Sequence, residues 1–116
     1  MPTITPTVEL FGGASARVTW ANMANGDIGE EVTLAEYSDR SIQVNGTFGA
    51  GGSVSIKGSN DGSTFATLTD PRGTALAITT ARIERIEDCT YAIRPEVTAG
   101  DGTTALTVTM FCRRGE

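Results

Sequence analysis

The sequence has no histidine, one lysine and two cysteines among its 116 residues. Without an imidazole there is no Ser-His-Asp or Cys-His nucleophilic system and no zinc site that uses histidine. Two cysteines also cannot supply a four-thiolate metal site. We therefore expect no catalytic residue, no cofactor and no metal, and we predict that the protein is not an enzyme.

Basic residues are few, with 9 Lys and Arg against 14 Asp and Glu and a formal net charge of -5. Nucleic-acid binders need a basic surface, because phosphate contacts supply most of their affinity. The single basic doublet, Arg113-Arg114, lies beside the C-terminus, where a solvated end is favoured over a phosphate contact. No run approaches the roughly 18 apolar residues of a membrane span, and the N-terminus does not resemble a secretion signal. We expect a soluble protein made in the cytoplasm, with no nucleic-acid or membrane partner.

Carboxylates are the remaining candidates for catalysis. The adjacent pairs, Glu30-Glu31 and Glu87-Asp88, would point to opposite faces of a strand. Asp61 and Asp101 stand in Gly-rich turns and lack the further oxygen ligands of a calcium loop. No spacing places two carboxyl groups across one cleft, as glycoside hydrolysis requires.

Thr and Gly are abundant, and two-residue alternation of apolar side chains recurs, which is typical of strands with one buried face. It predicts strands over 15–21, 32–37 and 42–48, and another over 54–58 that turns at 59–62. Ile83 and Ile86 are three residues apart, which predicts at most one short helical turn near residues 80–88.

The C-terminal quarter is predicted to form a long hairpin that turns at residues 99–102. Cys89 and Tyr91 share the apolar parity of its first arm, and Cys112 shares that of its second. Both cysteines are therefore expected to be buried free thiols. Tyr91 joins Trp20 and Phe48 as aromatic residues expected in the core, which favours a core role over a sugar-binding platform.

About eight short strands separated by Gly-rich turns predict an all-β chain, an antiparallel β-sandwich or jelly roll. We assign residues 8–116 to this single domain. Residues 1–7 contain two prolines and no core pattern, which predicts an extended N-terminal arm. Such an arm either is disordered or lies along a neighbouring molecule.

Two segments carry a resemblance to known proteins. The segment from Val54 to Leu68, a strand followed by a Gly-Ser-Asn-Asp-Gly turn, an aromatic residue and a leucine, resembles a hairpin of discoidin-like β-sandwiches and of small virion proteins of tailed bacteriophages. The run from Tyr91 to Met110 is similar to the closing hairpin of the same phage proteins. Unlike a true discoidin domain, this chain is short, has Phe65 where a tryptophan is usual, and lacks apolar spikes.

The resemblance implies a capsid cement, or decoration, protein. Such a protein binds the major capsid protein at subunit junctions on the outer surface of the virion, forms homodimers or homotrimers, and stabilises the expanded head. The alternative is a carbohydrate-binding or adhesion module of a head fibre or tail that contacts host glycans. The residues expected to make the contacts are those of the arm and the basic doublet: Pro2, Thr3, Ile4, Thr5, Pro6, Thr7, Arg113 and Arg114.

Overall fold

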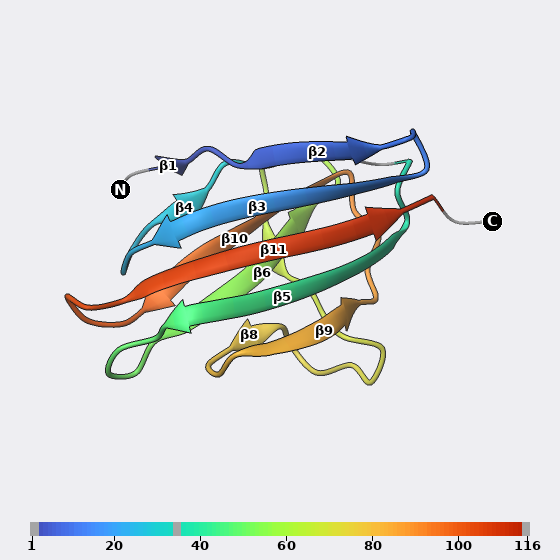
Figure 1. The fold of residues 1–116 in the computed structure, drawn as a ribbon. Helices are drawn as coiled ribbons and strands as arrows, with labels where there is room; N and C mark the ends of the chain where they lie inside the picture. Colours follow the sequence, from blue (N-terminus) through green and yellow to red (C-terminus); the bar gives the residue numbers. More distant parts are fainter. Residues whose placement is uncertain (1–2, 34–35, 115–116) are drawn as a thin grey trace.

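The chain folds into two β-sheets packed face to face, as seen in a computed structural model that describes residues 3–33 and 36–114 (Figure 1). No helix is present in these residues, which confirms the prediction of an all-β sandwich. The strands are β1 (Thr3–Ile4), β2 (Thr7–Phe11), β3 (Ser15–Met23), β4 (Ile28–Gly29), β5 (Asp39–Thr47), β6 (Ser53–Ser59), β7 (Ala66–Thr67), β8 (Ala77–Ile78), β9 (Arg82–Ile86), β10 (Ala92–Ala99) and β11 (Ala105–Arg113).

The two sheets have different strand orders. One sheet has the order β2-β3-β11-β5-β9, and all its neighbours are antiparallel. The other has the order β1-β4-β10-β6-β7, with β8 also paired to β6 and with β1 parallel to β4. Strands β2 and β9 are therefore the two edges of the five-stranded sheet.

Alternation in the long strands builds the core between the sheets. Strand β3 contributes Val18 and Trp20, and the indole N–H of Trp20 donates to the carbonyl oxygen of Glu30 at 2.9 Å. Phe48 packs against this cluster at its margin. The fully buried side chains of the other long strands are aliphatic or sulfur-containing, apart from Arg40 of β5, whose Nε donates to the carbonyl oxygen of Tyr37 at 2.8 Å.

The predicted C-terminal hairpin is wrong. Strands β10 and β11 belong to different sheets, and residues 100–104 carry the chain from one sheet to the other. Alternation identifies the buried face of each strand correctly but does not identify its partner, because a hairpin and an arch between sheets have the same apolar pattern.

Cys89 and Tyr91 are exposed, contrary to prediction. Strand β10 begins at Ala92, so both residues lie in the connection from β9, where strand alternation does not apply. Cys112 is buried as predicted, and both thiols are free.

Two further local predictions are corrected. Residues 82–86 form strand β9 rather than a helical turn, with Ile86 facing the core and Ile83 facing solvent. Their spacing of three thus joins residues on opposite faces of a strand. In the predicted strand 32–37, Val32 makes only an isolated bridge to Ile93, and residues 34–35 lie outside the described part of the chain.

A candidate interaction face

The outer face of the five-stranded sheet carries both aromatic and basic side chains. Its members alternate with the core residues of the same strands. They are Glu9 and Phe11 of β2, Arg17 of β3, Phe111 and Arg113 of β11, Asp39 and Ser41 of β5, and Ile83 and Arg85 of β9. We call this surface the arginine–phenylalanine face.

Strand pairing brings these side chains into contact across the sheet. Glu9 lies opposite Arg17, Arg17 opposite Phe111, and Ser41 between Phe111 and Arg85. The guanidinium group of Arg17 donates to both carboxylate oxygens of Glu9, at 2.8 and 3.2 Å. It also lies over the ring of Phe11, with 5.2 Å between Cζ and the ring centroid, within the range of a cation–π contact. The bond from Arg17 holds the pKa of Glu9 below its ordinary value.

Asp39 organises the opposite side of the face. Its Oδ2 accepts from Nε of Arg113 at 2.7 Å, and its Oδ1 accepts from Nη1 of Arg85 at 2.8 Å. The hydrogen bond from Arg113, assisted by the charge of Arg85, lowers the pKa of the Asp39 carboxyl group. Asp39 therefore stays ionised and fixes two guanidinium groups side by side.

These groups line an open pocket of about 280 Å³, together with Ser41 and Phe111. Asp39 engages one nitrogen of each guanidinium group, and a guanidinium group carries five N–H donors. The side chains of Arg85 and Arg113 are more than half exposed. The pocket thus combines an aromatic surface with donors that can bind an oxygen of a partner, such as a carboxylate.

Charge is distributed unevenly between this face and the rest of the chain. The face has three arginines and two carboxylates, for a formal charge of +1, while the whole chain carries -5. The remainder therefore carries -6. An acidic, partly apolar surface would be electrostatically complementary to this face.

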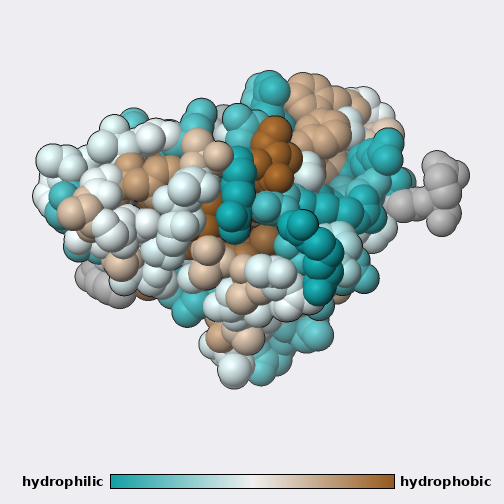
Figure 2. Space-filling model, turned by 90° about the horizontal axis from the view of Figure 1, so that it is seen from below, coloured by the Kyte–Doolittle hydropathy of each residue, from teal (hydrophilic) through white to brown (hydrophobic). Residues whose placement is uncertain are grey.

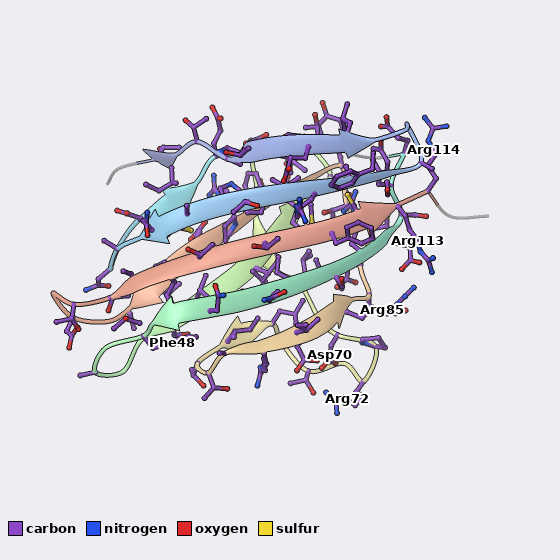
Figure 3. All side chains as sticks on the ribbon, in the orientation of Figure 1. Phe48, Asp70, Arg72, Arg85, Arg113 and Arg114 are labelled. Carbon is purple, nitrogen blue, oxygen red and sulfur yellow. The ribbon has the colours of Figure 1, made fainter. Side chains whose placement is uncertain are left out.

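The structure brings only part of the predicted interaction residues to this face. Arg113 lies on it, and Arg114 follows at the end of β11, where its backbone N–H donates to the carbonyl oxygen of Ala14 (Figure 3). The sequence analysis missed Phe111, Arg85 and Phe11. Their alternation with the core residues was the available indication, but it does not separate a functional outer face from an ordinary solvated one.

The described part of the predicted arm is incorporated into the sandwich. Thr3 and Ile4 form β1 and pair with β4, and Thr7 is the first residue of β2. Thr5 and Pro6 connect these two edge strands, so the segment passes from one sheet to the other. Pro2 lies outside the described residues.

The turn aspartates have structural partners. Oδ1 of Asp61 accepts from the backbone N–H groups of Ser63 and Thr64, which lowers the pKa of Asp61. Asp101 accepts from the N–H groups of Ala50 and Thr103, and these bonds lower its pKa to about 2. Asp101 thereby joins two loops at one end of the sandwich.

Two searches bear on other site types. Within residues 3–33 and 36–114, no group of three or more His, Cys, Asp or Glu side chains is arranged to hold a metal ion. The same part of the chain contains no helix that is long and apolar enough to cross a membrane.

Comparison with protein-family models and with curated proteins finds no match. Among solved structures, the fold is similar to that of the SPBc2 prophage-derived protein YomS, with a TM-score of 0.63. The similarity covers 90% of this chain and 98% of that one, at 11% sequence identity. The two chains therefore share the fold over nearly their full lengths.

Proposed function

We propose that this chain is a non-enzymatic structural protein of a bacteriophage virion. It binds the outer surface of the capsid at junctions between subunits of the major capsid protein and stabilises the expanded head. The observation that carries the proposal is the arginine–phenylalanine face, since exposed aromatic residues and arginines are the side chains enriched at protein interfaces. The fold shared with a prophage-derived protein supports the phage assignment.

The face suits binding to a repeated surface. Phe111 and Ile83 supply apolar area that loses water on contact, and the guanidinium groups held by Asp39 donate to carboxylates of the partner. Because Asp39 already orders both arginines, little side-chain entropy remains to be lost on binding. A modest single contact becomes tight when the copies are themselves linked on a lattice.

The location and copy number of the protein in purified particles test the virion assignment. Quantitative mass spectrometry of particles made by the host that encodes the chain should find hundreds of copies per head. A handful of copies would instead indicate a tail or fibre component, and absence from particles would reject a virion role.

A second experiment tests the face. Phe111→Ser and Arg85→Glu should each weaken co-sedimentation with expanded heads by roughly tenfold or more, as expected for central interface residues. Phe65→Ser is the matched control, because the Phe65 ring also stacks with an arginine, Arg94 at 3.9 Å, but contacts the six-stranded sheet. Equal loss in the control and the face variants would rule out this face as the contact.

The pocket also favours one alternative, a carbohydrate-binding or adhesion role. The exposed ring of Phe111 lies beside Asp39 and Ser41, and sugar sites commonly combine a ring that stacks on the sugar with polar groups that bind its hydroxyls. Binding on a glycan array that is lost in Phe111→Ser would support this alternative. A capsid-binding protein should give no such binding.

A further inference from the structure

The sandwich is open along strand β2. Val8 and Leu10 lie opposite Val18 and Ala16, which are completely buried, and so occupy the core-facing side of the five-stranded sheet. Nevertheless, Val8 is 46% exposed and Leu10 is 64% exposed. The outermost strand therefore extends beyond the opposite sheet and leaves two apolar side chains uncovered.

Within residues 3–33 and 36–114, no strand pairs with the outer edge of β2, and the nearest proline, Pro6, lies just before the strand. Strand β2 is the last strand of its sheet, so every second residue directs its backbone N–H and C=O groups away from β3. Natural edge strands are usually blocked by lysines, inward-facing charges, prolines or bulges. The only charged residue of β2 is Glu9, which points to the outer face and is neutralised by Arg17.

We propose that β2 is a self-association site, where a second copy of this chain adds its own β2 in antiparallel orientation across a two-fold axis at Leu10. The pairing gives hydrogen-bond partners to the free backbone N–H and C=O groups of both β2 strands. It also covers the exposed apolar side chains of both copies. A two-fold interface of this kind is closed, because each copy uses the same strand.

Charge complementarity selects the register. Val8 and Leu10 of the two copies must lie on the same face of the joined sheet. The registers that satisfy this condition are two residues apart, because a shift of one residue turns every side chain to the other face. A register centred on Glu9 would oppose two carboxylates, and one centred on Val8 would place Leu10 opposite Pro6. Centring on Leu10 places Glu9 opposite the second copy's Phe11.

That register also brings the arginine of each copy toward the carboxylate of the other. The guanidinium group of Arg17 lies over the ring of Phe11 in each chain. Because Phe11 of the second copy lies opposite Glu9 of the first, the second copy's Arg17 comes close to that Glu9. The two-fold axis produces the same approach between Arg17 of the first copy and Glu9 of the second. Repulsion between two chains of charge -5 is thus offset locally at the interface.

The dimer has a consequence for binding. It joins two five-stranded sheets into one continuous sheet, with both arginine–phenylalanine faces on the same side. The self-association proposal does not depend on the capsid proposal, because it is measured on the isolated chain.

Light scattering coupled to size exclusion tests the dimer. The wild type should have twice the mass of a 12.1 kDa chain, and Leu10→Glu should have the mass of one chain. Ile83→Glu is the matched control, since Ile83 is 65% exposed on the other edge strand, and it should remain a dimer. A monomeric wild type at its highest soluble concentration, or a dimeric Leu10→Glu, would overturn the proposal.

Cysteine cross-linking tests the register. In a Cys89→Ser background, Leu10→Cys should form a disulfide-linked dimer under mild oxidation, because directly opposed residues of antiparallel strands have the Cα spacing of a disulfide. Val8→Cys, which faces Gly12 of the second copy, should not. Cross-linking of Val8→Cys alone would overturn the register, and cross-linking of neither variant would overturn the pairing.

Discussion

The two edges of the five-stranded sheet differ in how well their inner-face side chains are buried. One row of paired residues crosses its inner face, from Leu10 of β2 through Ala16, Cys112 and Arg40 to Ile86 of β9. Leu10 at one end is largely exposed, whereas Ile86 at the other end is 2% exposed. Position on the inner face therefore does not decide burial. What decides it is whether the chain supplies a cover beneath the edge.

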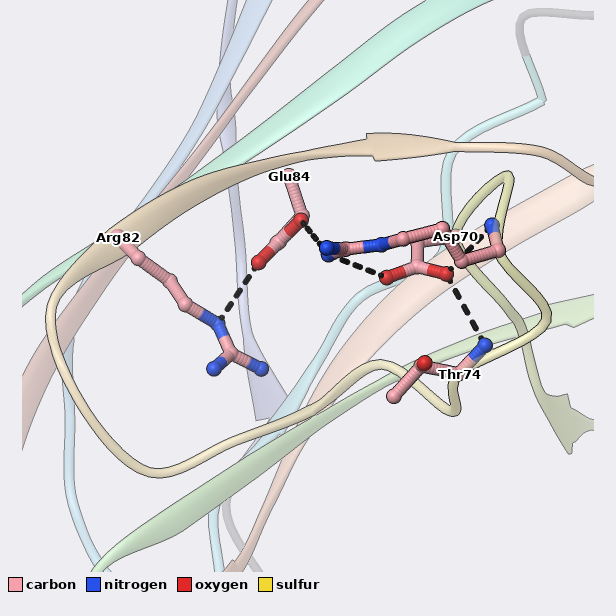
Figure 4. Close-up of polar contacts among 5 residues, drawn as sticks. Asp70, Thr74, Arg82 and Glu84 are labelled. Atoms are coloured by element: carbon pink, nitrogen blue, oxygen red, sulfur yellow. Dashed lines mark hydrogen bonds and ion pairs between the residues drawn. The ribbon is translucent and has the colours of Figure 1, made fainter.

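Beneath β9 the cover is a turn held by Asp70 (Figure 4). Oδ1 of this buried carboxylate accepts from the backbone N–H groups of Arg72 and Thr74, at 2.9 and 3.0 Å. The guanidinium group of Arg72 bridges Asp70 and Glu84 of β9, and Arg82 pairs with the other oxygen of Glu84. Seen from this edge, hydrophilic residues lie beside a hydrophobic area near the centre, and much of the remaining surface is of intermediate hydropathy (Figure 2).

The β2 edge has an apolar surface in place of such a network. Val8 and Leu10 stand where Glu84 and Ile86 stand at the other end of the same rows. One edge is thus closed by the chain itself with polar groups that also discourage further pairing. The other keeps its backbone groups and apolar side chains available to a second copy.

Truncating the residue at each end of this row to alanine should give the largest difference in stability between the two edges. Ile86→Ala should lower the free energy of unfolding by about 2–5 kcal/mol, because it removes packed methylene groups and leaves a cavity. Leu10→Ala should change the stability of the monomer by no more than about 0.5 kcal/mol, since the side chain is largely solvated. Urea unfolding at low protein concentration measures both.

Raising the protein concentration sharpens this result. If β2 mediates dimerisation, the wild type should unfold at higher urea as concentration rises, because association stabilises the folded state. Leu10→Ala should lose most of this dependence and Ile86→Ala should keep it. Equal stability losses in the two variants at low concentration would contradict the open edge.

The inner row was partly predictable from sequence. Alternation correctly placed Ala16 and Cys112 on buried faces, because both belong to long central strands with covers on their inner side. It could not rank Leu10 against Ile86, because the burial of a residue on an edge strand depends on whether another segment, such as the turn around Asp70, covers it. The same limit applies to the arginine–phenylalanine face, where strands distant in sequence bring Arg85 and Arg113 to one carboxylate.

The next largest effect should be a difference between the two edges in how stability depends on pH. The backbone hydrogen bond from Thr74 is the main cause of the lowered pKa of Asp70, so the folded state favours its ionised form. This stabilisation is complete above the unfolded pKa of about 3.9 and is lost as the pH falls toward the folded value. The stability gap between the wild type and Asp70→Asn should therefore be largest near neutrality and should shrink below about pH 5.

Glu9→Gln is the control at the β2 edge. The pKa of Glu9 is also lowered, by the hydrogen bond from Arg17. The stability difference between the wild type and Glu9→Gln should therefore also decrease as the pH falls. The gap should be smaller throughout, because this pair is exposed and screened by solvent. A gap that widens on acidification in Asp70→Asn would contradict the role assigned to the carboxylate.

The smallest effect concerns the thiol at the centre of the row. The Sγ of Cys112 donates to the carbonyl oxygen of Ala16, and burial raises the pKa of the thiol, which disfavours the reactive thiolate. In the native protein an aromatic disulfide reagent should modify the exposed Cys89 rapidly and Cys112 slowly. Ile86→Ala should accelerate the slow phase, because loosening the closed edge increases transient opening of the sheet. At a protein concentration where the wild type is monomeric, Leu10→Ala should leave that phase unchanged, because Leu10 is 64% exposed in the single chain and covers little of the row. Equal acceleration by both variants would show that β2 also protects the row and would remove the difference between the edges.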